Sequence, residues 1–159
     1  MAEMSDARRD QLDSIVEEFL HNFRTGRRLI AVDGSSPELA ARFADDLGAR
    51  IVAHDQLAAR ASVGAADETT LRSGTIEPFR AGELPGAESP DTVLVVDGQG
   101  VLDQPIHGIW HFRVWVLTGE ELPHAGADVI VDATDEQAPT RFFYDYCRIP
   151  PSAGDGGRR

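Results

Sequence analysis

Four short runs of apolar residues constrain the fold more than any other feature of this sequence. They cover residues 28–33, 92–96, 112–117 and 127–131, and Gly, Pro or Asp stands near the ends of each run. Runs that are apolar at nearly every position are typical of parallel strands that are covered on both faces of a sheet. With a further strand predicted over residues 50–53, we expect an α/β fold with a mostly parallel five-stranded sheet.

Two amphipathic helices are predicted in the N-terminal part of the chain. The first covers residues 5–24, where apolar side chains recur three and four positions apart, and Gly26 is placed to end it. The second covers residues 37–47 and is followed by Gly48. Because this second helix lies between two predicted strands, we expect a βαβ unit here.

The middle and the end of the chain carry weaker patterns. Residues 61–91 contain scattered Gly, Pro, Ser, Thr and Glu, so we expect mostly loop there, with one short helix near Ala58. The length suits one domain, which we expect over residues 1–150. Residues 151–159, rich in Gly and Arg, are expected to form a disordered tail.

The charge balance excludes several classes of partner. Acidic residues outnumber Lys and Arg by 27 to 15, which gives a formal net charge of -12. This charge repels phosphate backbones and anionic lipids, so we expect neither nucleic acid nor membrane as a partner. The single cysteine, Cys147, excludes a disulfide framework, and we expect a soluble, cytoplasmic protein. Every residue of the Lys and Arg class is arginine, so no reaction step can use a lysine amine.

The junction between the strand at 28–33 and the following helix is similar to a phosphate-binding loop. Such a loop needs a glycine-rich series of backbone N–H groups and a lysine, and neither a second glycine nor a lysine follows Gly34. Instead, Ser35 or Ser36 can cap the helix, and Ser35 with Glu38 fits a capping box. The carboxylate of Glu38 then stands where an anion would bind.

Taken in chain order, seven segments resemble the uridine kinase-like P-loop kinases, over roughly residues 10–138. The segments are RRLIAVDGSS, LAARFADDLGA, ARIVAHDQL, LRSGTIEPFRAGELPG, TVLVVDGQGVL, HFRVWVLTGEE and GADVIVDATD. The resemblance implies a three-layer P-loop NTPase-like sandwich. It also implies that Asp55, in ARIVAHDQL, occupies the position of the general base that acts on a nucleoside 5′-hydroxyl.

Two departures from the family concern the parts that handle phosphate. About four residues, including the lysine, are absent between Ser36 and Pro37. The arginine-bearing lid of the family is reduced to the short connection of residues 118–126. We therefore expect a catalytically inactive member that binds no cofactor and acts as a protein-binding scaffold or accessory subunit.

Two alternatives stay open. One is a small nucleoside or metabolite kinase that uses ATP and Mg²⁺, with Asp55 as the base and Arg72 or Arg80 in place of the lysine. The other is a sensor that binds a nucleoside without turnover. Asp55 also suits a simpler role, because an aspartate in this position often caps the next helix.

No metal site is expected from the sequence. Asp97 could be the remnant of a metal-binding carboxylate, but Asp97 with Gly98 is also a common turn dipeptide, and we favour the turn. The five histidines show no spacing typical of zinc ligands.

Aromatic residues concentrate beyond the part of the chain that resembles the kinases. They are Phe142, Phe143, Tyr144 and Tyr146. The segment fits either an added edge strand, or a tail packed on the first helix, or a contact for a partner, since aromatic residues are enriched at protein interfaces. We expect a protein partner or a homo-oligomer, with these four residues in the contact.

Overall fold

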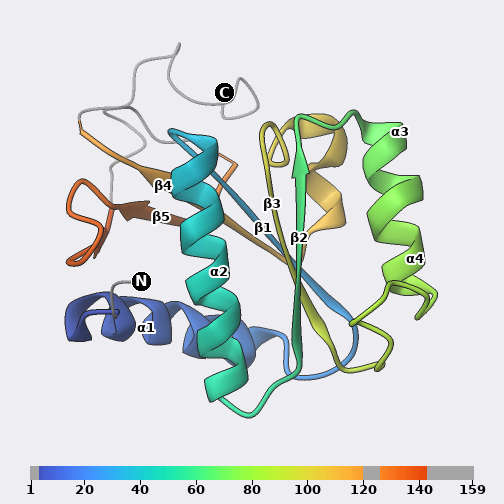
Figure 1. Ribbon diagram of the computed structural model, residues 1–159, viewed down its shortest axis with the longest axis horizontal. Coiled ribbons are helices and arrows are strands. Elements are labelled where there is room, and N and C mark those ends of the chain that lie inside the picture. The colour runs from blue at the N-terminus through green and yellow to red at the C-terminus, as the bar shows by residue number, and fades with distance from the viewer. Residues whose placement is uncertain (1–3, 120–125, 143–159) are drawn as a thin grey trace.

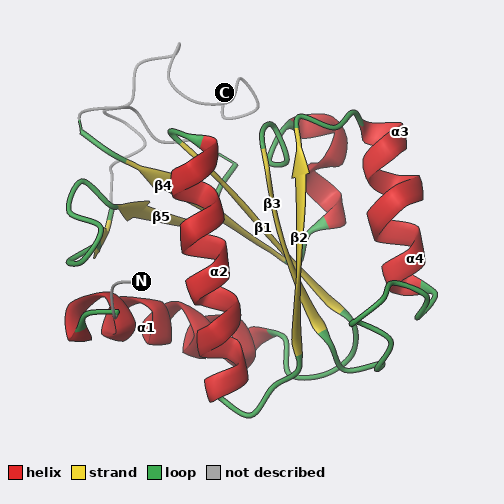
Figure 2. Ribbon diagram, in the orientation of Figure 1, coloured by secondary structure: helices red, strands yellow, loops and turns green. Residues whose placement is uncertain are grey.

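A six-stranded sheet forms the centre of the computed structural model, which describes residues 4–119 and 126–142 (Figure 1, Figure 2). The strand order is β2-β3-β1-β4-β5-β6, and neighbouring strands run parallel except β5 and β6. The strands are β1 (Arg28–Gly34), β2 (Ala58–Gly64), β3 (Val93–Gly98), β4 (Phe112–Leu117), β5 (Val129–Asp132) and β6 (Thr140–Arg141). The expected mostly parallel α/β sheet is confirmed, with six strands in place of five.

Helices cover both faces of this sheet, which gives three layers. One face packs against α1 (Asp6–Asn22) and α2 (Pro37–Ala53). The other packs against one continuous helical segment and a 3₁₀ turn. The segment comprises α3 (Glu68–Leu71), a π-helical turn (Arg72–Ile76) and α4 (Glu77–Arg80), and the 3₁₀ turn covers Gln104–Ile109. Among the described residues, no helix combines the length and the apolar content that a membrane span requires.

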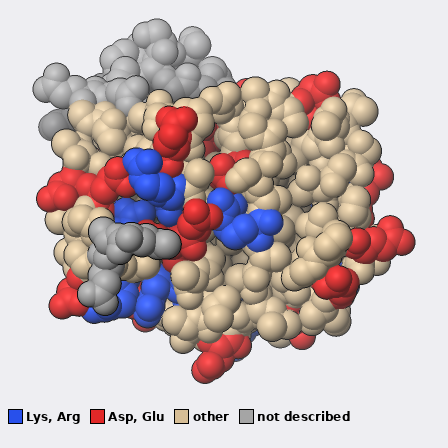
Figure 3. Space-filling model, viewed as in Figure 1, with Lys and Arg blue, Asp and Glu red and all other residues tan. Residues whose placement is uncertain are grey.

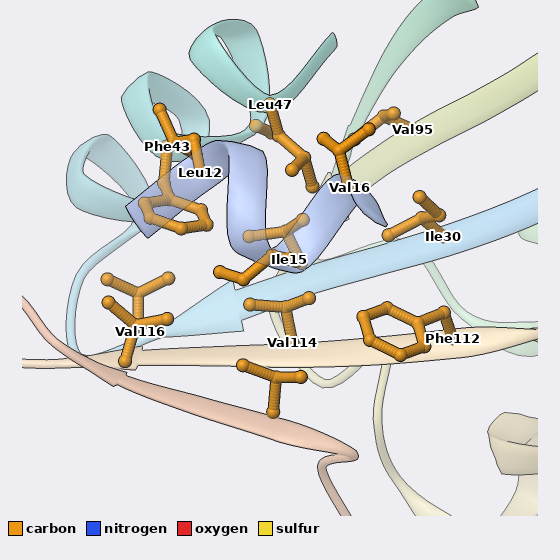
Figure 4. Close-up of a cluster of buried hydrophobic side chains, with 14 of the residues drawn as sticks. Leu12, Ile15, Val16, Ile30, Phe43, Leu47, Val95, Phe112, Val114 and Val116 are labelled. Atoms are coloured by element: carbon orange, nitrogen blue, oxygen red, sulfur yellow. The ribbon is translucent and has the colours of Figure 1, made fainter. Parts of the chain in front are cut away.

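The side chains of β1 show why its sequence is apolar at consecutive positions. Ile30 (Figure 4) and Val32 pack in the layer with α1 and α2. Leu29 and Ala31 pack in the opposite layer. Successive side chains of a strand point to opposite faces, so a strand that is covered on both sides must be apolar at both. The strands predicted from the other apolar runs, now β3, β4 and β5, are confirmed, and β3 divides its side chains between the two layers in the same way.

The predicted end of the second helix and the predicted strand at 50–53 are wrong. Helix α2 continues to Ala53, because Ile51 extends the buried series of Phe43 and Leu47 by one more turn. Gly48 lies inside the helix, where it faces the aliphatic part of Arg60 on β2: a Cβ at Gly48 would lie 3.5 Å from the Arg60 Cδ atom.

The mostly loop interpretation of residues 61–91, with a short helix near Ala58, is also wrong. Ala58 opens strand β2, which is a half-buried edge strand of small residues, and residues 68–80 form the helical segment. Pro78 lies inside this segment and has no N–H for a regular helical hydrogen bond. The wider π-helical turn directly precedes it, as is common where the regular hydrogen-bond series is interrupted.

Candidate functional site

The strand order places the candidate site at the carboxyl ends of β1 and β3. These strands are neighbours, but the segments that follow them cover opposite faces of the sheet: α2 follows β1, and the 3₁₀ turn follows β3. In open α/β sheets, ligands bind outside the carboxyl ends of the strands at such a point. Residues 33–36 and 97–100 form this edge.

The connection from β1 to α2 consists of two residues, Ser35 and Ser36. Of the two serines considered for the helix cap, the structure assigns Ser36, whose Oγ accepts a hydrogen bond from the Leu39 N–H at 3.1 Å. Pro37, which opens the helix, has no N–H. The described contacts therefore leave at most two backbone N–H groups at this helix start, those of Ser36 and Glu38, to bind an anion.

Ser35 is turned away from the helix and bonds to the end of β4. Its N–H donates to the carbonyl of Val116 at 2.9 Å, and its Oγ accepts from the Thr118 N–H at 3.1 Å. The capping box predicted for Ser35 and Glu38 is therefore wrong, because the hydroxyl of Ser35 serves the neighbouring strand. Gly34 packs equally closely: a Cβ there would lie 2.3 Å from the Val116 carbonyl oxygen. The connection is held directly against β4.

Asp33 joins the ends of β1 and β3. One carboxylate oxygen accepts from the Gly34 N–H at 2.7 Å, and the other accepts from the Gly100 N–H at 2.8 Å. The side chain is buried, with 7% exposed. Sequence reasoning missed this residue as a member of the site, although an acidic residue directly after a run of four apolar residues was an available signal.

Asp97 lies within β3, and the turn begins after it, so the turn predicted at Asp97 and Gly98 is wrong. Its carboxylate accepts from the Ser62 hydroxyl at 2.6 Å and pairs with the Arg60 guanidinium at 2.8 Å. Arg60 also pairs with Asp45 of α2 at 2.9 Å. Asp97 thus ties β3 to β2, and the part of the chain that the structure describes contains no group of three side chains suited to a metal ion.

Asp55 lies near the amino ends of the parallel strands, whereas the candidate site lies at their carboxyl ends. It stands in the turn after α2 with a φ of 64°, and β2 begins only at Ala58. Since β1 and β2 run in the same direction, the start of β2 lies away from Gly34 at the end of β1. The predicted position of Asp55 at the carboxyl end of a strand is wrong because the strand at 50–53 is helix.

The two arginines considered as substitutes for the lysine are also placed by the structure. Arg72 pairs with Glu68 at 2.8 Å in the helical segment. Arg80 ends α4 and lies near His111: burial, and after it the charge of Arg80, lowers the pKa of that imidazole. His111 Nδ1 accepts from the N–H of Leu29 at 3.0 Å, at the start of β1. Arg80 therefore lies near the amino ends of the parallel strands, away from the candidate site at their carboxyl ends.

A hollow of about 360 Å³ lies at the carboxyl ends of β2 and β3. Its lining residues come from the segments that follow these two strands and include Gln99, Gly100 and three carboxylates, Asp67, Glu68 and Asp103. Asp67 caps α3, and the hydrogen bond that it accepts from the Thr70 N–H holds the pKa of its carboxyl below the ordinary value. The hollow is of a size that a small polar molecule can enter.

The aromatic segment is described only at its beginning. Thr140 and Arg141 form β6, an antiparallel strand added beside β5, and the N–H of Phe142 donates to Ile130 at 2.7 Å. Arg141 pairs with Glu18 of α1 at 2.5 Å. Residues 140–142 therefore form an added edge strand that is tied to the first helix. Phe143, Tyr144 and Tyr146 lie outside the described residues, as do residues 120–125 of the predicted short lid connection.

Comparison with a solved structure agrees with this architecture. A possible uridine kinase from Bacillus stearothermophilus superposes with a TM-score of 0.50 and 12% identity, over 68% of this chain and 80% of that chain. The chain has a P-loop kinase-like fold. A candidate fructose transport system kinase from Silicibacter sp. TM1040 gives a TM-score of 0.44 and 16% identity, over 66% and 73% of the two chains. No family model and no curated protein matches the sequence.

Proposed function

We propose that this protein uses a P-loop kinase-like fold as a non-catalytic scaffold or accessory subunit that binds another protein. The observation that supports this most is the two-residue connection between β1 and α2, which packs against β4. A phosphate loop at this position has to wrap its backbone around the phosphates. Here the backbone N–H of Ser35 donates to the Val116 carbonyl, and the Ser35 hydroxyl accepts from the Thr118 N–H.

The energetics favour loss of triphosphate binding. Binding at micromolar concentration needs about 8 kcal/mol, and each charge-assisted hydrogen bond contributes roughly 1.5 to 3 kcal/mol. The described contacts leave at most two N–H groups free at the start of α2, and the chain contains no lysine. The carboxylates of Asp33 and Glu38 stand on either side of the connection and repel an anion.

The kinase alternative, with ATP and Mg²⁺, fits the geometry less well. The base that the family resemblance implies, Asp55, stands at the other edge of the sheet from Gly34. Of the two arginines, Arg80 lies at that same far edge, and Arg72 is paired with Glu68. A kinase built on this chain would need a base and a cation from other positions.

A nucleoside sensor without turnover is the second candidate, and the hollow favours it. Carboxylate and amide groups from Asp67, Gln99 and Asp103 line a space at the edge where this fold class binds ligands. Such groups can accept and donate hydrogen bonds to the hydroxyls of a ribose. This binding would not need the phosphate connection.

Thermal unfolding with ligands tests the proposal. Millimolar ATP with Mg²⁺ should leave the Tm unchanged in the native chain and in Glu38→Gln, which removes only the exposed carboxylate at the helix start. A ligand at 100 times its Kd would add about 2.7 kcal/mol and raise the Tm by about 5 to 10 °C. Such a rise with ATP would refute the non-catalytic proposal. A rise with uridine or cytidine alone, absent with ATP, would establish the sensor.

A further inference from the structure

β2 is a terminal strand of the sheet, and no other described strand pairs with its outer edge. The Val93 N–H donates to the Leu57 carbonyl at 2.8 Å, which fixes the direction of the backbone groups along the strand. Because these groups alternate between the two edges, those of Ala59, Ala61 and Val63 face β3. The N–H and C=O groups of Ala58, Arg60 and Ser62 therefore face outward.

The surface around this open edge is largely uncharged. Figure 3 shows charged side chains gathered over α1 and α2, and few of them over β2 and toward α3. Val52 and Leu57, near the start of β2, are large apolar side chains that are each 55% exposed. The charge of Arg60 is offset by Asp45 and Asp97 on the α2 side of the sheet. Along residues 58–64 a second copy therefore meets little like charge, and the exposed carboxylates of Asp55 and Asp67 flank the strand on either side.

The sequence of β2 is complementary to itself when it runs antiparallel about Ala61. In that register Ala59 lies opposite Val63 of the partner subunit, and the partly buried apolar face of the strand continues across the junction. Arg60 lies opposite Ser62 of the partner subunit, and both present outward backbone groups, which is the requirement for a hydrogen-bonded pair. A two-fold axis at Arg60 would instead place two guanidinium groups opposite each other.

We propose that two copies of this chain pair antiparallel through β2, about a two-fold axis at Ala61, and join their sheets into one. The regular backbone hydrogen bonds of this pairing are confined to residues 60–62 of each copy, because the register with β3 shifts between Ser62 and Gly64. The exposed Leu57 of each copy then lies toward Ala65 of the partner subunit. This inference does not rest on the proposed function, since a symmetric dimer would serve a kinase and a scaffold equally.

The expected salt dependence distinguishes a second copy from a basic protein partner. Two copies of charge -12 repel each other at a distance, so salt should strengthen their association. A basic strand drawn to this acidic chain would be released by salt. Both partners would bind the same edge of β2, but added salt would strengthen the association with a second copy and weaken that with a basic protein.

Sedimentation velocity on the full chain tests the dimer. We expect monomers and dimers in equilibrium, with a Kd for the dimer below about 1 mM. This Kd should be lower at high salt than at low salt. Ser62→Pro removes an outward N–H and should weaken dimerisation about tenfold or more, whereas Ser62→Ala keeps that N–H and should not. Leu57→Asp adds a charge at the exposed start of β2 and should weaken it likewise, while Ala7→Asp, which adds the same charge at an exposed position of α1, should not.

Circular dichroism on each variant separates a loss of pairing from a loss of folding. If Ser62→Pro unfolds, Leu57→Asp still decides, because Leu57 is exposed. A monomer at every concentration and salt, a dimer that both variants leave intact, or an association that salt weakens would each overturn the proposal. None of these results changes the Tm response to ATP, so failure of the dimer and failure of the proposed function are observed separately.

Discussion

Replacing Gly34 by alanine tests directly whether the β1–α2 connection is as closed as the structure indicates. The added Cβ would lie 2.3 Å from the Val116 carbonyl oxygen and 3.3 Å from the Val116 Cβ. Ordinary contact requires the ends of β1 and β4 to separate by roughly 1 Å. The same separation would lengthen the two hydrogen bonds that Ser35 makes with Val116 and Thr118, at the end of β4 and directly after it.

The expected cost follows from these contacts. Overpacking at a rigid backbone costs about 1 to 3 kcal/mol, and weakening two hydrogen bonds costs about 0.5 to 1.5 kcal/mol each. We therefore expect Gly34→Ala to lower the free energy of unfolding by about 2 to 6 kcal/mol. Urea denaturation followed by circular dichroism measures this difference.

Gly74→Ala is the matched control. Gly74 lies in the helical segment at 68–80, and a Cβ there would meet nothing within 4 Å. Alanine should raise the free energy of unfolding by about 0.5 to 1 kcal/mol at that position. A loss below about 1 kcal/mol for Gly34→Ala would show that the connection can open without breaking its bonds to β4, and the reasoning for a closed site would be refuted.

Two further substitutions test the cap and the buried histidine. Ser36→Ala should lower the free energy of unfolding by about 0.5 to 2 kcal/mol in urea denaturation, because the Leu39 N–H loses its acceptor; an unchanged midpoint would contradict this role. Burial, and then the charges of Arg80, Arg28 and Arg113, lower the pKa of His111, so the unfolded chain binds a proton at a higher pH than the folded chain does. The stability should be constant above about pH 6.5 and should fall as the pH drops toward the folded-state pKa. In His111→Asn, whose side-chain oxygen can still accept from Leu29, the decline between about pH 6.5 and 5 should be smaller, and equal slopes in both proteins would exclude His111 as its source.

The sequence predicts the covered strands well and the edge strand poorly. β1 and β3 are buried on both faces, so their consecutive apolar residues identify them directly. β4 is buried on the face toward α1 and α2 and half-buried on the other. β2 is half exposed and consists mainly of small side chains, and only its contacts with β3 and α2 define it as a strand. The error at β2 also misplaced Asp55, since the assignment of a base to that residue depended on the strand before it.

The candidate site was predictable in part. The glycine, the serines and the proline between β1 and α2 mark a helix start in the sequence itself, and Ser36 performs the expected cap. The bonds from Asp33 to Gly100 and from Ser62 to Asp97 join residues 67 and 35 positions apart. No local pattern indicates contacts of that kind, because the strand order alone brings those residues together.

The central place of β1 has a consequence for the synthesis of the chain. Both neighbours of this strand come later, since β3 begins at Val93 and β4 at Phe112. Helices α1 and α2 can cover one face of β1 early, but its two edges stay unpaired while about 60 further residues are added. At about 5 to 20 residues per second, this takes about 3 to 12 seconds. An apolar strand with two bare edges is a template for pairing with other chains. Those seconds are therefore the period in which the nascent protein is most exposed to aggregation and most dependent on chaperones.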